Sequence, residues 1–520
     1  MTQGPSRSFA LRQLISAEIK KECEKHIARH FEYLQRLQEY ADRKTRREGL
    51  QFQKLIHLRK WWKLAPGFNP FKVRSKKNLE IYSFTLAKKI RERTYAPKPC
   101  VRYYRIKEDG TQRPLNIFQL PDSAVSRLAY ESLLLKNVAK FSAYSYAYRK
   151  DKTAHHAAMD IFSEWRMLDR IYVAEYDFSK FFDRIDHKYL LDVIHEHQFI
   201  VSREEEQLIK AFLESESAEM HEYPNGLEKR ERGIPQGTSI SLFLANIACW
   251  ELDRELERLG VGFARYADDT VVWSEDYTKV VRAYYVIDEN ARRMGVPINL
   301  IKSHGINLIS RRELSGEITT KDSIDYLGYR ISLDRISIKE SRVRKIKAKI
   351  SYLIFQNLLQ PLKKGIFNSG RLTSELDLDY VTAIRQVRAY MYGGLTNEKL
   401  HRYLAGRTSD LNFRGLMSYY PIVNDSAQLA LLDGWLGHTF RQALRARERM
   451  WKQKGRQALP GPVPDWIDEV TKIKTGKLPG GDTEDISVPS FLLINRALQM
   501  AIAKSGLLAV ANPASQYYES

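Results

Sequence analysis

The chain has 520 residues, 43% of them hydrophobic and 28% charged, which is typical of folded globular proteins and excludes a disordered chain. No apolar run approaches the roughly 18 to 20 residues that a membrane span needs, and the start, MTQGPSRSFALRQ, lacks the apolar core of a signal peptide. Three widely separated cysteines form neither a zinc motif nor a disulfide framework, so we expect a cytoplasmic protein with no membrane partner.

The positive charge is unevenly distributed along the chain. The formal net charge is +21, and residues 1–100 alone hold 24 Lys or Arg against 9 Asp or Glu, a net of +15. A field of this size attracts a polyanion, either nucleic acid or an acidic membrane face. A solvated helical surface is the alternative, but the imbalance is too large for paired surface charges and favours nucleic acid.

The first third of the chain is predicted to be mostly helical. Apolar residues recur near helical spacing over residues 9–60, and a further helix is predicted over 79–93. Residues 100–117 alternate on both sides of Glu108-Asp109-Gly110, which predicts a β-hairpin. Residues 122–170 are again predicted to be mainly helical.

The middle of the chain mixes strands and helices. We expect a strand over residues 170–179, a helix over 187–197, and one helix through LFLANIACWELDRELERLG (242–260). A strand pair follows around Asp268, then a helix over 278–294 and short strands as far as 332. From about residue 338 the chain is predicted to be mainly helical, with loops at 460–466 and 477–485.

Adjacent aspartates open the apolar segment RYADDTVVW (265–273). Asp177 ends another apolar strand, so two paired strands would bring Asp177, Asp268 and Asp269 together. Two carboxylates about 4 Å apart repel by about 4 kcal/mol at an effective dielectric near 20, which bound divalent cations would offset. Two Mg²⁺ ions held by such acids can activate a hydroxyl and stabilise a leaving phosphate. Alone, an Asp-Asp pair is more often a turn or a helix cap.

Seven motifs in a fixed order change that assessment. They are RIKEDGTQRPL (105–115), SYAYRKDKTAHHAA (145–158), EYDFSKFFDRIDH (175–187), GIPQGTSISLFLANI (233–247), YADD (266–269), PINLIKS (297–303) and YLGY (326–329). Over about residues 95–335 the chain thereby resembles reverse transcriptases of the bacterial group II intron and retron-like lineage. The resemblance implies an α+β right-hand polymerase: fingers, a palm with an antiparallel sheet, and a helical thumb.

The resemblance also implies a role for each matching residue. Asp177 and Asp268 would be the principal metal ligands, with Asp269 as a supporting acid and the Phe178 carbonyl as a further metal contact. For the nucleotide, the implied residues are Lys107 and Arg113 on the triphosphate, Phe182 as the gate against a ribose 2′-hydroxyl, Gln236 in the pocket, and Lys302 as the proton donor to pyrophosphate. Tyr266 would lie by the primer end. Taken singly, these residues could equally be core or surface positions. The family often has Gly at Ala147 and Pro at Leu242, but neither departure removes a catalytic group.

The C-terminal region resembles the RNA-binding part of group II intron maturases. LLDGW (431–435) carries this likeness, and Arg441, Arg445, Arg449 and Lys452 place positive charge on one helix face. A solvated charged face is the alternative. We therefore predict four domains: a basic helical extension (1–94), fingers and palm (95–335), a helical thumb (336–410) and a helical maturase-like domain (411–520).

The predicted function is RNA-directed DNA polymerisation with two Mg²⁺ ions, an RNA template, deoxynucleotides and a DNA product. Because no Cys/His cluster of intron endonucleases is present, the layout most resembles defence-associated reverse transcriptases, which implies antiphage defence with a cognate non-coding RNA as template. A group II intron maturase is the alternative. The sequence leaves open whether the chain forms a homo-oligomer and whether DNA starts on an RNA 3′ end or on Tyr517 or Tyr518.

Overall fold

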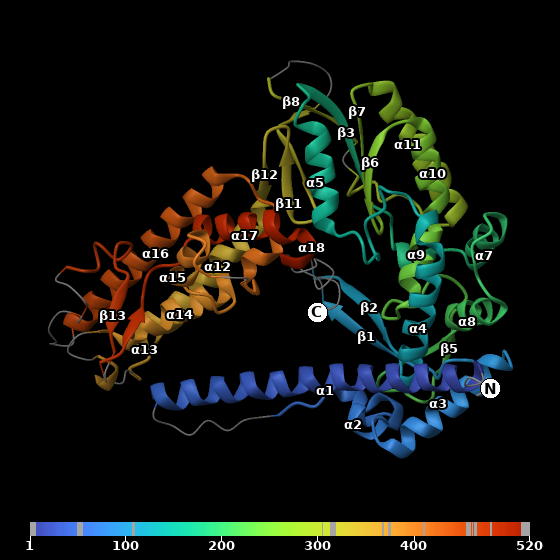
Figure 1. The fold of residues 1–520 in the computed structure, drawn as a ribbon, viewed down its shortest axis with the longest axis horizontal. Coiled ribbons are helices and arrows are strands. Elements are labelled where there is room, and N and C mark those ends of the chain that lie inside the picture. Colours follow the sequence, from blue (N-terminus) through green and yellow to red (C-terminus); the bar gives the residue numbers. More distant parts are fainter. Residues whose placement is uncertain are drawn as a thin grey trace.

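The computed structural model describes the chain in segments separated by short gaps. In Figure 1, a body of sheets and helices and a mainly helical C-terminal region lie side by side above one long helix. None of the described helices is long and apolar enough to cross a lipid bilayer. The described residues are 7–48, 56–106, 110–303, 305–312, 319–366, 369–372, 376–408, 411–453, 459, 461, 465–478 and 481–510.

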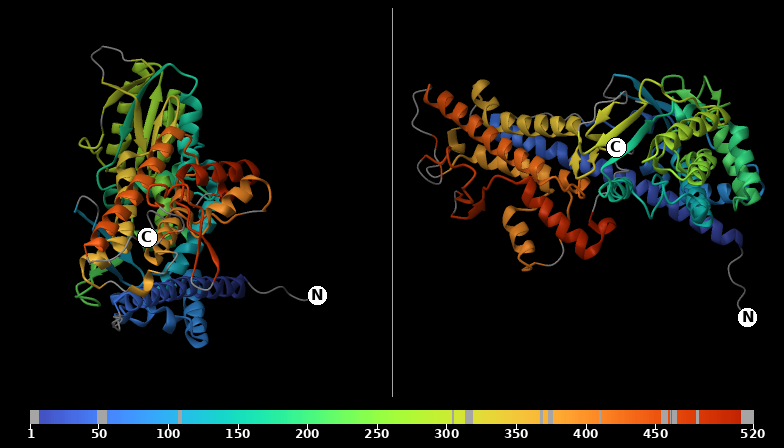
Figure 2. Two further views of the ribbon diagram at one scale, coloured as in Figure 1. Left: turned by 90° about the vertical axis from the view of Figure 1, so that its left-hand side faces the viewer. Right: turned by 90° about the horizontal axis from the view of Figure 1, so that it is seen from above.

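A single helix of 42 residues, α1 (Arg7–Glu48), runs beneath the sheets and the C-terminal helices, with α2 and α3 on its lower side (Figures 1 and 2). Its first half packs on α3 (Lys76–Arg91) and α4 (Leu120–Asn137). Ile15 and Ile19 recur at helical spacing on the packed side and are fully buried, so an apolar stripe fixes this half of the helix. The short helix α2 (Pro70–Val73) completes the contact.

The smaller sheet is built on the predicted hairpin. Strands β1 and β2 pair antiparallel on either side of Gly110, whose φ of +80° is readily adopted by glycine. Strand β1 also pairs in parallel with β4, which gives the order β2-β1-β4-β5. The bounds are β1 (Cys100–Ile106), β2 (Gln112–Ile117), β4 (Glu216–Glu219) and β5 (Glu228–Lys229).

The larger sheet joins strands that are far apart in the chain, in the order β6-β7-β3-β8-β9. Strand β3 pairs antiparallel with β7 on one side and β8 on the other. Val173 and Val271 belong to the apolar cluster that contains α5, whereas their neighbours Ala174 and Val272 belong to the cluster that contains α11, so both faces of the sheet are apolar and covered. The bounds are α5 (Ala154–Trp165), β3 (Arg170–Tyr176), β6 (Gly262–Tyr266), β7 (Asp269–Ser274), α11 (Tyr277–Met294), β8 (Ile306–Ser310) and β9 (Thr320–Lys321).

Further helices pack around these two sheets, and a third, three-stranded sheet leads into the C-terminal region. The order of its strands is β10-β11-β12, and all pairs are antiparallel. The bounds are α6 (Phe181–Arg184), α7 (His187–Glu196), α8 (Arg203–Leu213), α9 (Ile240–Ala248), α10 (Trp250–Leu259), β10 (Ser323–Tyr326), β11 (Tyr329–Ser332) and β12 (Ile336–Ile338).

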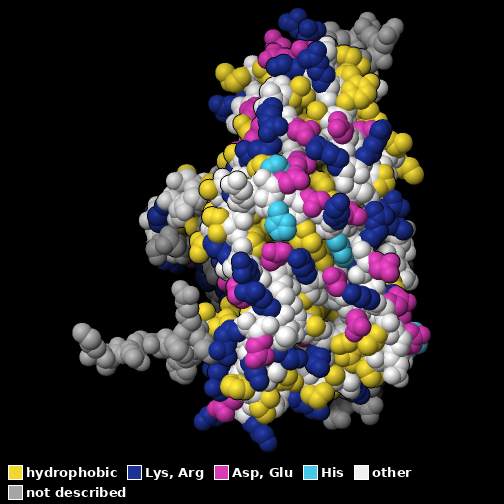
Figure 3. All heavy atoms as spheres, turned by 90° about the vertical axis from the view of Figure 1, so that its right-hand side faces the viewer, with side chains coloured by type: hydrophobic (Ala, Val, Ile, Leu, Met, Phe, Trp, Pro, Cys, Tyr) yellow, Lys and Arg dark blue, Asp and Glu magenta, His cyan; other side chains and the backbone are white. Residues whose placement is uncertain are grey.

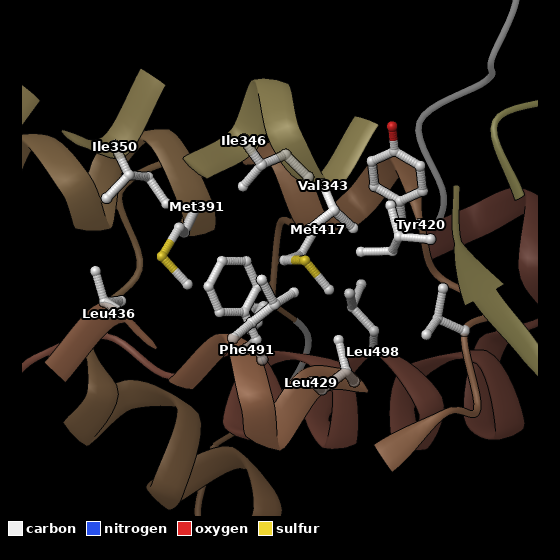
Figure 4. Packing of buried hydrophobic residues seen from close by; sticks show 14 of the residues in the cluster. Val343, Ile346, Ile350, Met391, Met417, Tyr420, Leu429, Leu436, Phe491 and Leu498 are labelled. Atoms are coloured by element: carbon white, nitrogen blue, oxygen red, sulfur yellow. The ribbon is translucent and has the colours of Figure 1, made fainter. Parts of the chain in front are cut away.

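The C-terminal region is a helical assembly around one apolar core. Ile346 and Ile350 of the first helix face Met391, Leu436 and Phe491 from three later helices (Figure 4). Both predicted C-terminal domains contribute to this core, and the boundary between them at 410 stays a prediction. The bounds are α12 (Glu340–Leu358), α13 (Gln360–Lys363), α14 (Leu378–Tyr392), α15 (Asn397–Leu404), α16 (Ser426–Lys452), β13 (Thr475–Lys477), β14 (Thr483–Asp485), α17 (Phe491–Ser505) and α18 (Leu507–Val510).

A buried arginine ties three of these helices together. Arg447 of α16 is fully buried and pairs with Asp377 at 2.6 Å and Asp379 at 2.9 Å, both at the start of α14. Its guanidinium also donates to the Leu358 carbonyl at the end of α12 at 2.7 Å. Because buried charges are costly unless they are paired and hydrogen-bonded, this network fixes how α12, α14 and α16 meet.

Four details of the predicted structure need correction. Residues 56–59 are not helical, and α1 ends at Glu48. The helix predicted over 242–260 is divided at Cys249, where the backbone leaves helical geometry. The segment predicted as a loop at 477–485 has strand at both ends, because Lys477 belongs to β13 and residues 483–485 form β14. On α16, Arg445 pairs with Asp468, and Lys452 with Glu448, so the predicted basic face is partly neutralised within the chain.

Candidate active site

The hairpin between β6 and β7 places two acids in a tight turn. Tyr266 and Asp269 are paired across the strands, which leaves Ala267 and Asp268 as the turn. Ala267 has a φ of +61°, an uncommon conformation for a residue with a side chain. On the neighbouring strand, Tyr176 pairs with Thr270, and Asp177 follows directly. The structure therefore brings Asp177, Asp268 and Asp269 to one edge of the sheet.

The electrostatics of the three aspartates reflect this convergence. Burial, and then the Asp177 charge, raise the pKa of Asp268 to about 6. Burial, and then Asp268 and Asp177, raise the pKa of Asp269 to about 7. Both raised pKa values reflect an excess of negative charge at a buried site, and a bound cation would offset that charge.

Two side chains from the PINLIKS segment hold Asp177. The Asn299 amide donates to Asp177 Oδ2 at 3.1 Å, and Lys302 Nζ lies 3.2 Å from the same oxygen. The Asn299 backbone N–H also donates to the Asp177 carbonyl at 2.8 Å. Lys302 therefore lies beside the first of the three acids, and Asn299 is an orienting residue that the sequence did not reveal.

The donor set fits a hard divalent cation. Mg²⁺ prefers oxygen ligands and is usually held by one or two carboxylates together with substrate phosphates, so it does not need an all-protein cage. Another group of possible metal ligands lies elsewhere. Within the described ranges, Glu196, His197 and Glu251, at the end of α7 and on α10, have ligand atoms that all lie within 4.8 Å of one another. That triplet is a partly neutralised surface cluster, because Arg293 pairs with Glu251 at 3.0 Å.

A cavity of about 1080 Å³ adjoins the aspartate edge, and Phe182, Gln236, Tyr266 and Arg113 line it. The Gln236 side chain joins two elements, because it accepts from Arg113 Nε at 2.9 Å and donates to Asp183 at 3.1 Å. The following glycine is sterically required: a Cβ on it would lie 2.4 Å from the Asn116 carbonyl oxygen. This close approach brings the Pro-Gln-Gly loop onto strand β2.

The remaining predicted residues fall into two groups. Phe178 is 2% exposed and forms an isolated bridge with Ile298, next to Asp177. Lys107 lies outside the described residues, as do Tyr517 and Tyr518. The structure therefore brings together the predicted acids, Arg113, Phe182, Gln236 and Lys302, whereas the placement of Lys107 is not described.

A buried arginine supports the acidic turn and was missed by the sequence reasoning. Arg265 is fully buried and pairs with both oxygens of Asp253 on α10, at 2.6 and 2.7 Å. It also donates to the Ala267 carbonyl at 3.0 Å and to Ser145 Oγ at 2.8 Å. Arg265 thus holds the strained residue before Asp268 and docks the SYAY segment against it. Its position in RYADD was the only signal in the sequence.

Comparison with known proteins agrees with this geometry. The family model described as reverse transcriptase (RNA-dependent DNA polymerase) matches residues 106–331, a range that contains all three aspartates and the paired strands that carry them. The chain contains a reverse transcriptase domain. The predicted α+β right-hand polymerase fold is confirmed for this domain, which has the fingers hairpin β1-β2 and a palm sheet whose strands β6, β7, β3 and β8 pair antiparallel.

Curated relatives are similar to this domain rather than to the whole chain. The group II intron-encoded protein LtrA of Lactococcus lactis subsp. cremoris is 27% identical over 210 residues, which are 40% of this chain and 32% of LtrA. Protein YkfC of Escherichia coli (strain K12) is 29% identical over 175 residues, 33% and 44% of the two chains. The Retron Ec86 reverse transcriptase of E. coli is 27% identical over 124 residues, 23% and 35%. The chain thus matches less than half the length of each.

Solved telomerase structures also align with the chain. The Candida albicans enzyme, in complex with a TWJ fragment of telomeric RNA, aligns with a TM-score of 0.37 at 13% identity and covers 74% of this chain and 66% of its own. The Candida tropicalis enzyme in the equivalent complex gives 0.39 at 13% identity, with coverage of 80% and 64%.

Proposed function

We propose that this protein is an RNA-directed DNA polymerase that adds deoxynucleotides to a hydroxyl end. The observation that carries the proposal is the pairing of β3 with β7, which brings Asp177, Asp268 and Asp269 to one edge beside a cavity. When bound, two Mg²⁺ ions would supply activation of the attacking hydroxyl and charge stabilisation of the pyrophosphate. Asp177 and Asp268 would be their principal ligands, with Asp269 and the Phe178 carbonyl in support.

The chain's own residues would select and orient the nucleotide. Arg113, held by Gln236, offers a fork of donors to triphosphate oxygens, and Lys107 would bind the same group. Phe182 lines the cavity and would exclude a ribose 2′-hydroxyl. Lys302, beside Asp177, would donate a proton to the departing pyrophosphate.

The activity is tested on poly(rA) primed with oligo(dT), with dTTP and Mg²⁺. We expect the chain to extend the primer, and an excess of EDTA to stop extension while leaving the far-ultraviolet circular dichroism unchanged. Absence of extension by a folded preparation that binds the primed template would contradict the proposal.

The finer proposal is that the polymerase copies a cognate non-coding RNA in the bacterial cytoplasm and acts in antiphage defence. Its support is the order of the sequence motifs and the similarity to a retron reverse transcriptase. Sequencing the RNA and any DNA that co-purify with the chain tests it. A short discrete transcript with complementary DNA is expected, together with protection of cells against phage that is lost in a catalytic variant.

A second candidate is an intron maturase that assists RNA folding, because LtrA is a group II intron-encoded protein. Co-purifying intron RNA flanked by exons would favour this candidate over the defence proposal. The two candidates share the polymerase site, so the primer-extension assay does not distinguish them.

A further inference from the structure

The cavity beside the aspartates extends beyond the nucleotide pocket to the N-terminal helix. Lys25, His26 and Arg29 on one side of α1, together with Trp61, line it as well as Phe182 and Gln236. Positions 25, 26 and 29 are three and four residues apart, so they share one face of the helix. These residues precede the range that the family model matches, which begins at 106.

Positive groups are crowded at the wall that α1 contributes to the cavity, where Arg59 lies beside the lining residues Arg29 and Trp61 without lining the cavity itself. Burial, and then the nearby Arg29 guanidinium, lower the pKa of Arg59. Burial, and then Arg59 and Arg29, lower the pKa of His26 to about 4. Within the described part of the chain, neither Arg29 nor Arg59 has a carboxylate oxygen within 4.0 Å, although Glu22 lines the same wall. Like charges kept together without a paired carboxylate point to an anionic ligand.

Aromatic rings accompany these charges. The Trp61 and Tyr103 rings meet edge to face with centroids 5.5 Å apart, and the Arg59 guanidinium lies 5.4 Å from the centre of the Trp61 ring. Tyr103 is 40% exposed. Trp62, which follows Trp61 in the chain, is buried, and its ring lies 5.9 Å from that of Phe71. This contact anchors the segment. Basic groups interleaved with partly exposed rings are the features that bind single-stranded nucleic acid.

An outer face of the molecule shows a different distribution of charge. On the side shown in Figure 3, Lys and Arg side chains are interspersed with Asp and Glu over the whole surface. Such a mixed surface is typical of a solvated exterior. The cations clustered where α1 lines the cavity are therefore a local feature, which the overall positive charge of the chain does not explain.

We propose that Arg29, Arg59 and Trp61 form a subsite for unpaired RNA, namely the stretch of template that has not yet been copied. This inference rests on the proposed polymerase function. Helices α13 and α14 lie on the opposite side of the molecule from α3 (Figure 1), so a copied duplex leaving toward them would leave the cavity wall formed by Lys25, His26 and Arg29 to the incoming strand. Arginines would hold the phosphates of this strand, and Trp61 would stack on a base.

The test compares hybrids that share one primer duplex and carry either a 2-nucleotide or a 10-nucleotide RNA overhang ahead of the primer end. Fluorescence anisotropy gives the Kd of each, and extension by one nucleotide on the short overhang reads the polymerase site. We expect the wild-type protein to bind the long overhang at least about fivefold more tightly. In the double variant Arg29→Ala and Arg59→Ala, this gain should disappear while extension on the short overhang stays within about twofold.

A matched control removes the same number of charges elsewhere. Lys20 and Lys88 lie outside the cavity and each pairs with a Glu four residues later, on α1 and α3 respectively. The double variant Lys20→Ala and Lys88→Ala should keep the full overhang gain. The inference is overturned if wild type shows no gain, if the arginine variant keeps it, or if the control loses it equally. Wild-type extension on the short overhang reports separately on the proposed function.

Discussion

Two regions of the molecule each contain a fully buried arginine, and the two arginines have different consequences. In the palm, Arg265 pairs with Asp253; in the C-terminal region, Arg447 pairs with Asp377 and Asp379. Both also donate to backbone carbonyls. Arg447 donates to a carbonyl at the end of a helix within an apolar assembly, whereas Arg265 donates to Ala267, the turn residue before Asp268. The same kind of buried ion pair therefore fixes the packing of helices in the C-terminal region, and in the palm it supports the turn that carries the candidate catalytic acids.

The chemistry proposed for the palm depends on the charges of Asp268 and Asp269. The double substitution Asp268→Asn and Asp269→Asn keeps side-chain size and removes the charge that would hold metal. DNA synthesis should fall at least about 10³-fold, since bound ions supply several kcal/mol of stabilisation and each 1.36 kcal/mol is tenfold. Primer extension measures the loss, and RNA binding should be retained. Synthesis near the wild-type rate would refute the metal assignment.

The two arginines should respond differently when each is replaced by methionine with a neutralised partner. Single variants Arg265→Met and Arg447→Met leave a buried carboxylate unpaired and should each lower the free energy of unfolding by about 3 to 5 kcal/mol. Adding Asp377→Asn to the second should recover stability and DNA synthesis together. Adding Asp253→Asn to the first should recover stability alone, because the Ala267 carbonyl still lacks its donor.

Denaturant unfolding and primer extension on the same four proteins provide the comparison. Recovery of synthesis in the Arg265→Met and Asp253→Asn protein would show that Arg265 is architectural too, and the contrast between the regions would fail.

Substitutions of Lys302 test whether this residue donates a proton during the reaction at the palm. As a proton donor it should contribute about 10²-fold to the rate, so Lys302→Met should slow single-nucleotide incorporation by that factor with little change in dNTP affinity. The control is Lys302→Arg, which keeps the charge but does not release its proton. If Lys302→Arg restores the rate, the residue acts through charge alone.

Phe182 and its neighbour give the smallest expected effect. Phe182 lines the cavity and Phe181 is 2% exposed in the core. Phe182→Val should raise ribonucleotide incorporation relative to deoxynucleotide by about tenfold, because space opens for the 2′-hydroxyl. Phe181→Val should lower stability and leave the ratio unchanged. Equal ratios in wild type and an active Phe182→Val protein would mean that Phe182 is a packing residue.

The sequence was most informative where the signal is local. Alternating apolar residues, the turn at Gly110 and the adjacent Asp268 and Asp269 predicted the fingers hairpin and the acidic edge. It could not reveal Arg265, because its partners Asp253 and Ser145 are 12 and 120 residues away. Arg447 lies on the apolar face of α16, three residues after Leu444, but its ion pairs with Asp377 and Asp379, 70 and 68 residues away, follow only from how the helices meet. The extent of α1 and the strand pair β13-β14 likewise depend on tertiary packing.

The length of α1 has a mechanical consequence. Its described packing partners are α2, α3 and α4, and the ring contact between Phe31 and Phe71 lies toward the middle of the helix. Residues 33–48 continue beyond it for about 24 Å at the usual rise per residue. For a rigid helix, a change of about 10° in the direction of the half that packs on α3 and α4 moves the far end by about 4 Å, and the hydrogen bond from the His57 backbone N–H to the Tyr33 hydroxyl moves with it. A reporter placed there would read small rotations of the fingers as large displacements.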